Sequence, residues 1–170
     1  MSRFVRFDLS VELVTELLQR HKRGHLKDSD YRHQVLIGRF TKEALTAINI
    51  PDRAVVSSVR LLVKIMEKHG LPPETVASLR ELILKPVAVY ESATERDSIV
   101  VVTIEMPEGI NPLLVAIRID VPDSVNKPNM HWMVNTYTKD DPAIVKRWEA
   151  NGLLICKREP VVEVMTAPVA

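Results

Sequence analysis

The 170-residue chain contains a single cysteine, Cys156, and only five glycines. One cysteine excludes a disulfide within the chain, which is typical of a protein from a reducing compartment. The few glycines form no GxGxxG or GxxxxGKS/T loop, so nucleotide hydrolases of those types are excluded. No apolar run is long enough to span a membrane, and the first residues lack the apolar stretch of a signal peptide. We therefore expect a soluble cytoplasmic protein that does not contact a membrane.

Charge is close to balanced overall but is distributed unevenly. The net charge is +1, yet residues 1–85 carry 15 Lys and Arg against 10 Asp and Glu, while residues 86–170 carry 8 against 12. A basic surface of this kind suits nucleic acid, and the alternative is an ordinary solvated helix surface. The densest basic stretch contains Arg20, Lys22, Arg23, Lys27, Arg32 and Arg39.

Hydrophobic periodicity changes near the middle of the chain. In the first half, apolar residues recur at helical spacing, which predicts helices over residues 10–22, 29–48, 55–69 and 73–84. After residue 86, stretches rich in Val, Ile, Thr and Tyr alternate with turn-forming residues, which is typical of strands. They predict strands over residues 86–91, 98–106, 113–120, 131–139 and 153–157, with a short helix over 142–150.

We therefore expect an α+β fold in which N-terminal helices precede an antiparallel sheet of about four or five strands, with one short C-terminal helix. The same pattern divides the chain into three parts. Residues 1–50 form a helical N-terminal extension, residues 51–159 an α+β domain, and residues 160–170 a loosely held tail.

The predicted helix over residues 55–69 carries polar groups suited to chemistry on a phosphodiester. Lys64 lies near its centre and His69 at its end. A histidine with a pKa near neutrality and a fixed cation are what metal-free cleavage of RNA needs. An ordinary helix end would also favour a lysine, a histidine and a glycine at Lys68, His69 and Gly70, so both interpretations stay open.

A second polar set follows the predicted strand over residues 131–139. Strict alternation places His131, Met133, Asn135, Tyr137 and Lys139 on one face. An imidazole, an amide, a phenol and an ammonium in a row can bind a phosphate and transfer a proton. The alternative interpretation is the solvent-facing side of an antiparallel sheet.

The order of these segments resembles a known family. Residues from about 55 to 157 are similar to the MuF C-terminal type of domain, encoded by phages and mobile elements. That type is placed in the barnase–EndoU–colicin–RelE superfamily of small ribonucleases. The similar stretches are Val59–His69, Leu82–Ser92, Ile99–Thr103, Leu113–Ile117, Asn135–Asp140 and Trp148–Leu154.

The resemblance implies a ribonuclease, used as a toxin or effector, that needs neither metal nor cofactor. It implies RNA as the substrate partner, with tRNA as one option. It also implies a second possible partner, an immunity or inhibitor protein. The helix motif falls on Lys64 and His69, and the strand motif on Asn135, Tyr137 and Lys139. Asn135 stands where the family usually has a serine, so this residue departs from the pattern.

Two hypotheses follow for the function. In the first, the domain is a metal-independent ribonuclease, and in the second it is a non-catalytic module that binds nucleic acid or protein. The candidate catalytic residues are Lys64, His69, His131, Tyr137 and Lys139, and the candidate substrate-binding residues are Ser58, Arg60, Asn135 and Thr136.

Overall fold

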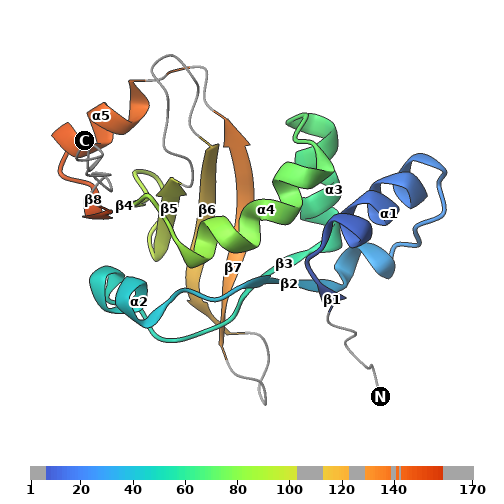
Figure 1. Ribbon diagram of the computed structural model, residues 1–170, viewed down its shortest axis with the longest axis horizontal. Coiled ribbons are helices and arrows are strands. Elements are labelled where there is room, and N and C mark those ends of the chain that lie inside the picture. The colour runs from blue at the N-terminus through green and yellow to red at the C-terminus, as the bar shows by residue number, and fades with distance from the viewer. Residues whose placement is uncertain (1–6, 103–112, 123–128, 139–140, 142, 159–170) are drawn as a thin grey trace, which may run out of the picture.

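The computed structural model describes residues 7–102, 113–122, 129–138, 141 and 143–158 (Figure 1). Within these ranges the chain forms five α-helices, one short 3-10 helix and a single mixed sheet of eight strands. The elements are β1 (Phe7–Asp8), α1 (Val11–Lys22), η1 (Asp30–Arg32), β2 (Gln34–Gly38), α2 (Lys42–Ile48), β3 (Val55–Ser58), α3 (Val59–Lys68), α4 (Pro73–Leu84), β4 (Ala88–Glu91), β5 (Ser98–Val102), β6 (Leu113–Val121), β7 (Met130–Thr138), α5 (Ile144–Ala150) and β8 (Leu154–Lys157).

The α+β class is confirmed, but the sheet differs from the predicted one. Its strand order is β1-β2-β3-β7-β6-β5-β4-β8. The five strands from β7 to β8 pair antiparallel with one another, whereas β1 pairs parallel with β2 and β3 pairs parallel with β7. The prediction of an antiparallel sheet of four or five strands was therefore wrong in extent and in type.

Two of the three additional strands, β2 and β3, come from segments that the sequence suggested were helical. Residues 34–38 form β2, and the helix that follows begins only after Thr41, whose hydroxyl accepts a hydrogen bond from the Ala44 N–H at 3.2 Å. Likewise, residues 55–58 form β3 before α3 begins. Short apolar runs fit a buried strand and one side of a helix equally well, which explains both errors. The segment before residue 50 is therefore not wholly helical, and residues 160–170 lie outside the described part of the chain.

Helices α1, α3 and α4 cover one face of the sheet, which we call the helical face (Figure 1). Val14 of α1, Leu62 of α3 and Leu79 of α4 are fully buried there against strand residues that include Ile37 and Ile117. Burial of this apolar surface is the main contribution that stabilises the fold. None of the described helices is long and apolar enough to cross a membrane.

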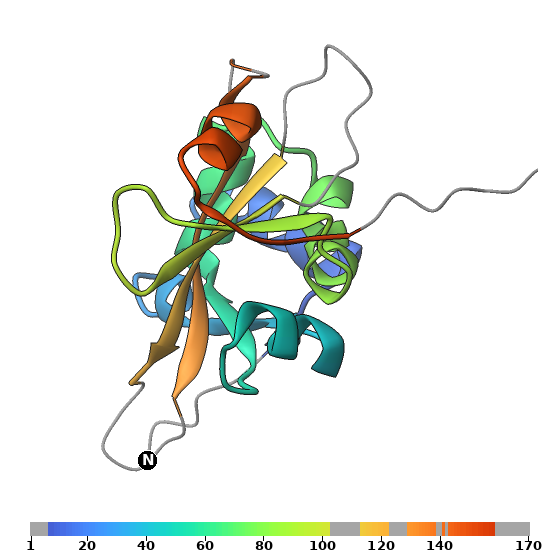
Figure 2. The ribbon, with the colours of Figure 1, turned by 90° about the vertical axis from the view of Figure 1, so that its left-hand side faces the viewer.

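The opposite face of the sheet is covered only in part. Helix α5 packs there through Val145 and Trp148 against Tyr90 and Leu114. A separate small cluster, formed by Leu36, Ala54, Val56, Met130 and Trp132, contains no residue from a helix. The sheet is strongly twisted, so that β4 and β8 cross the direction of β6 and β7 at a steep angle (Figure 2).

Candidate functional site

Helix α3 continues the direction of β3 and so runs beside β7. Strand β3 pairs with the first part of β7, through Val55 with His131 and Val56 with Trp132. Ser58 then caps the helix, because its hydroxyl oxygen accepts the Leu61 N–H at 3.2 Å. The helix ends at Lys68, His69 is its C-cap residue, and Gly70 follows with a φ of +64°, a conformation that favours glycine. This path brings the end of α3 to the far end of β7.

A β-bulge in β7 decides which side chains share a face. Met133 lies opposite Ile117 and Asn135 opposite Ala116, so β7 has one extra residue, Val134, at this point. Because a bulge shifts the alternation by one, Asn135 and Tyr137 point to the opposite face of the sheet from Met133. The predicted single face carrying residues 131, 133, 135 and 137 was therefore wrong.

Thr136 lies on the helical face as a consequence of the bulge. It is fully buried, and its hydroxyl donates a hydrogen bond to the sulfur of Met133 at 3.4 Å. Its backbone N–H donates to the Oδ1 atom of Asn135 at 3.1 Å. The side chain of Thr136 is therefore buried in the core. Of Thr136 and Asn135, only Asn135 is accessible, and it lies on the opposite face of the sheet.

The structure brings His69 and Tyr137 together. Their ring centroids are 6.4 Å apart with an interplanar angle of 45°. His69 is exposed, whereas Tyr137 is half-buried, and burial raises the pKa of its phenol. The Tyr137 hydroxyl is therefore protonated at neutral pH. An exposed imidazole beside a protonated phenol offers a proton acceptor and a proton donor at one place.

The other predicted residues of α3 lie away from this pair. Lys64 is exposed and, in the described part of the chain, forms no ion pair. It precedes His69 by five residues, which places it about 140° around the helix. Arg60 lies four residues before Lys64, on the same side of the helix, and its guanidinium group is 5.4 Å from the ring centroid of Tyr31. Ser58 is occupied as the helix cap.

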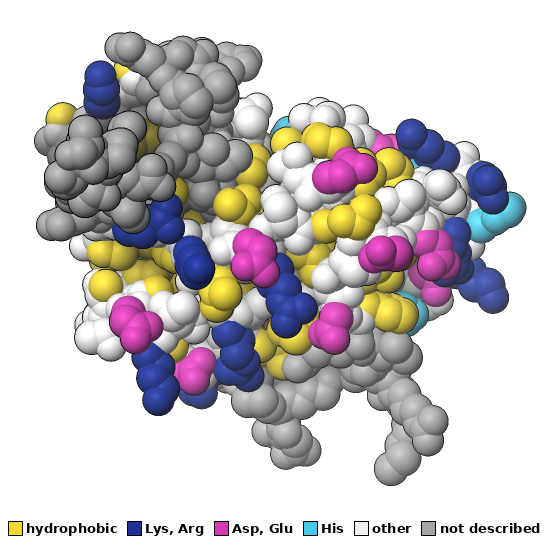
Figure 3. Space-filling view, viewed as in Figure 1, with side chains coloured by type: hydrophobic (Ala, Val, Ile, Leu, Met, Phe, Trp, Pro, Cys, Tyr) yellow, Lys and Arg dark blue, Asp and Glu magenta, His cyan; other side chains and the backbone are white. Residues whose placement is uncertain are grey.

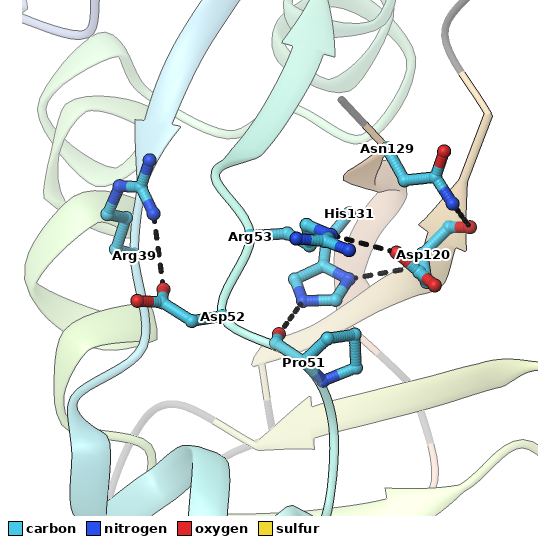
Figure 4. A network of polar contacts seen from close by, with 7 residues as sticks. All are labelled: Arg39, Pro51, Asp52, Arg53, Asp120, Asn129 and His131. Atoms are coloured by element: carbon cyan, nitrogen blue, oxygen red, sulfur yellow. Dashed lines mark hydrogen bonds and ion pairs between the residues drawn. The ribbon is translucent and has the colours of Figure 1, made fainter. Parts of the chain in front are cut away.

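His131 is fully buried and lies in a separate polar network (Figure 4). Its Nε2–H donates to the carbonyl of Pro51 at 2.9 Å, and its Nδ1 accepts the backbone N–H of Asp120 at 3.0 Å. Burial lowers the pKa of His131, so the ring is neutral. Tyr137 lies six positions further along β7, roughly 18 Å along the strand. The structure therefore keeps His131 apart from the His69–Tyr137 pair.

Asp120 connects this network to the surface. It has a φ of +52°, and its carboxylate accepts a hydrogen bond from Nε of Arg53 at 3.0 Å. Arg53 lowers the pKa of the Asp120 carboxyl. The side-chain amide of Asn129 donates to the backbone carbonyl of Asp120 at 3.2 Å. Together these bonds hold the ends of β6 and β7 around His131, which gives His131 a structural role.

An open groove of about 1120 Å³ lies beside this network, at the other end of β6 and β7 from Tyr137. It is lined by Ile48, Ile50, Pro51 and Ile155 and by residues 91–99 and 118–122. No histidine, lysine or tyrosine lines it. Carboxylates are the groups of this groove that could transfer protons, and we prefer the His69–Tyr137 region because it combines an imidazole with a phenol.

The predicted basic stretch does not form one uninterrupted positive surface. Arg20 lies 3.7 Å from the carboxylate of Asp30, and Arg39 lies 3.1 Å from that of Asp52. On the face shown in Figure 3, Lys and Arg side chains alternate with Asp and Glu. No group of three metal-binding side chains gathers among the residues that the structure describes. Lys139, the remaining candidate, lies outside those residues.

The fold and the site define a small α+β domain in which a helix end and a sheet strand together present a polar pair. The family model for the phage MuF C-terminal domain matches residues 62–159, more than half of the chain, and the chain belongs to this family. No curated protein and no solved structure matches the chain. The matched segment begins inside α3, so β1, β2 and β3 lie before it.

Proposed function

We propose that this phage-associated domain is a metal-independent endoribonuclease of the toxin or effector type, with His69 and Tyr137 as its catalytic pair. The observation that carries the proposal is the 6.4 Å contact between the two rings, because it joins elements 68 residues apart in the sequence. The proposal places the domain with the barnase–EndoU–colicin–RelE ribonucleases.

The proposed reaction is an attack of the RNA 2′-hydroxyl on the adjacent phosphorus. His69 accepts the proton of the 2′-hydroxyl as the 2′-oxygen–phosphorus bond forms. The bond from phosphorus to the 5′-oxygen breaks, and the phenol of Tyr137 donates the proton that this leaving oxygen needs. The products are a 2′,3′-cyclic phosphate and a 5′-hydroxyl. The raised pKa of Tyr137 suits a donor that must be protonated before the reaction.

Two further residues are proposed to contact the phosphate. Asn135 and Tyr137 lie on the same face of β7, and the Asn135 Oδ1 already accepts a backbone N–H, so its Nδ2 can donate to a phosphate oxygen. Lys64 is exposed on α3, about 140° around the helix from His69, and contributes positive potential for the RNA backbone. We expect Lys64 to affect the binding of RNA more than the chemical step. His131 has no part in this site.

The test is cleavage of a fluorogenic single-stranded RNA in the presence of EDTA. We expect His69→Ala to lower kcat/KM by roughly 10²- to 10⁴-fold, which is the usual contribution of a general base. Tyr137→Phe should lower kcat by roughly a hundredfold and leave KM nearly unchanged. The products should carry a 2′,3′-cyclic phosphate, and an otherwise identical substrate with a 2′-deoxynucleotide at the cleavage site should stay intact.

His25→Ala is the matched control, because His25 is also exposed, follows the end of another helix and has no side-chain partner in the described part of the chain. Its activity should equal that of the wild type. Cleavage that survives in both His69→Ala and Tyr137→Phe would contradict the proposal. So would intact RNA with folded wild-type protein at high concentration. In that second case, salt-dependent RNA binding would favour the alternative function, a non-catalytic binding module.

A further inference from the structure

One row of side chains crosses the sheet on the face opposite the helical face. In register across neighbouring strands lie Leu36 of β2, Val56 of β3, Trp132 of β7, Arg118 of β6 and Ser98 of β5. Residues in register on neighbouring strands point to the same side of a sheet. The side chains of Trp132 and Arg118 therefore leave the sheet side by side, on the same face, at the centre of this row.

The centre of the row is accessible. Trp132 is only partly buried, and its indole N–H has no partner among the described residues and is not enclosed. Arg118 is exposed and, within the same described ranges, has no ion pair. Val134, in the adjacent bulge, is 41% exposed. The cluster beneath Trp132 consists of residues from the strands and from Ala54, and no described helix covers it.

This surface is continuous with the proposed catalytic pair. Trp132, Asn135 and Tyr137 follow one another on the same face of β7, because the bulge places Asn135 and Tyr137 on the side of Trp132. The distance from Trp132 to Tyr137 along the strand is roughly 15 Å. A few nucleotides of an unpaired strand cover such a length. Tyr137 in turn contacts His69.

We propose that this face is a nucleobase-binding subsite for single-stranded RNA, in which a base stacks on Trp132 and Arg118 contacts the neighbouring phosphate. The inference rests on the proposed nuclease function and names the class of its substrate. Aromatic side chains bind unpaired bases by stacking, whereas the bases of a duplex are already stacked on one another. The domain then discriminates against paired RNA before the cleavage step.

The charges along the row indicate which side of β7 the RNA backbone follows. On the β6 side of Trp132 lies the cation of Arg118, and at the far end of the row, beyond Leu36, lies the exposed carboxylate of Asp8. A phosphate next to the stacked base is attracted by Arg118 and repelled by Asp8. We therefore expect the backbone of the RNA to follow the β6 side of β7 from the subsite to Tyr137.

The test is the binding of a short fluorescein-labelled 2′-O-methyl RNA, measured by fluorescence anisotropy. This probe cannot be cleaved through its 2′-oxygen, so binding is measured apart from catalysis. We expect Trp132→Leu to raise the Kd roughly five- to 150-fold, the effect of losing one base–aromatic stack. Leucine keeps apolar contact with the cluster beneath, and Trp132→Phe should recover much of the affinity because it restores a ring.

Arg118→Ala should weaken binding and lower the slope of log K against log salt by about one. Its matched control is Arg80→Ala, because Arg80 is an exposed arginine on α4, on the helical side of the sheet. That variant should bind like the wild type. The same RNA as a duplex should bind more weakly, and its Kd should not depend on Trp132.

An unchanged Kd in Trp132→Leu with folded protein would overturn the subsite. So would a wild-type protein that sediments as a dimer and becomes monomeric in Trp132→Leu, because this face would then be a subunit interface. Cleavable RNA of the same sequence separates the two proposals. If probe binding depends on Trp132 but no cleavage occurs, only the nuclease proposal is contradicted. If Trp132→Leu cleaves RNA with an unchanged KM, only the subsite proposal is contradicted.

Discussion

The backbone N–H of Asp120 donates a hydrogen bond to the Nδ1 atom of the buried His131, at 3.0 Å. Nδ1 must carry no proton to accept this bond, and Nε2 must carry one to donate to Pro51. The neutral ring with a proton on Nε2 is thus the form that the fold requires. Protonation of Nδ1 would place a hydrogen against the Asp120 N–H and leave a charge in the interior.

The stability of the protein should therefore fall as the pH decreases below the ordinary pKa of histidine, 6.5. The unfolded chain takes up a proton on His131 near that pH, while burial holds the folded pKa lower, so the unfolded state binds more protons in the interval between the two values. Above 6.5 both states are neutral at this residue and the effect is absent. Urea unfolding at about pH 7.5 and about pH 5.5 measures the change in the free energy of unfolding.

His131→Gln isolates this contribution, since an amide keeps a donor and an acceptor but does not titrate. The difference in unfolding free energy between the two pH values should be smaller in His131→Gln than in the wild type. His25→Gln, which changes an exposed histidine, should show the wild-type difference. An equal difference in all three proteins would mean that His131 does not titrate differently in the folded state.

The cap of α3 gives a second prediction. Ser58→Ala removes the hydroxyl that accepts the Leu61 N–H and should lower the free energy of unfolding by about 0.5–2 kcal/mol. Ser29→Ala is the matched control, because Ser29 precedes the 3-10 helix η1 without a side-chain hydrogen bond. It should change stability by less than about 0.5 kcal/mol. Chemical denaturation measures both, and equal losses would show that the Ser58 hydroxyl has no special role.

Much of the fold can be predicted from local pattern. Helix α4 forms over the predicted residues, and α1, α5, β6 and β7 begin and end within two residues of the predicted bounds. These segments are long enough for periodicity to distinguish helix from strand. Strands β2 and β3 are too short for that. Their apolar residues, such as Val35 and Val55, were assigned to helices that in fact begin later in the chain.

The site depends on features that a single strand does not contain. The bulge at Val134 exists because β6 pairs with both halves of β7 at registers that differ by one residue, and no residue of β7 alone indicates it. His131 occurs in the same polar run as Asn135 and Tyr137. The hydrogen bonds that hold its ring in the interior are made with Pro51 and Asp120, which lie outside this strand. The sequence pattern could therefore nominate His69 and Tyr137 but could not separate them from His131.

The hydroxyl of Tyr90 should contribute to holding α5 on the sheet. It donates to the Glu149 carboxylate at 2.9 Å, and the same oxygen accepts Nζ of Lys157 at 3.0 Å. Lys157 and then Tyr90 lower the pKa of the Glu149 carboxyl. Tyr90→Phe keeps the buried ring, which packs 5.5 Å from that of Trp148, and loses only the hydrogen bond. The free energy of unfolding should fall by about 1–2 kcal/mol.

A double-mutant cycle with Glu149→Gln tests this assignment. If the hydroxyl acts through the carboxylate, Tyr90→Phe should cost less in the Glu149→Gln background than in the wild type. Losses that simply add would show that the two groups are not coupled, and the effect of Tyr90→Phe would then not come from its hydrogen bond to Glu149.

Deletion of Val134 tests the register that the candidate site depends on. With Val134 absent, Asn135 would follow Met133 directly, and each would keep its partner on β6, Ala116 and Ile117. Side chains before and after the deletion would stay on their present faces, because the deletion removes only the extra residue of the bulge. We expect a folded protein that is destabilised by no more than about 3 kcal/mol. Deletion of Thr136 is the contrasting variant, because it would turn Tyr137 toward the helical face and should abolish the thermal unfolding transition. Two deletion proteins that melt alike would show that β7 lacks this bulge, and Asn135 and Tyr137 would then not share the face of Trp132.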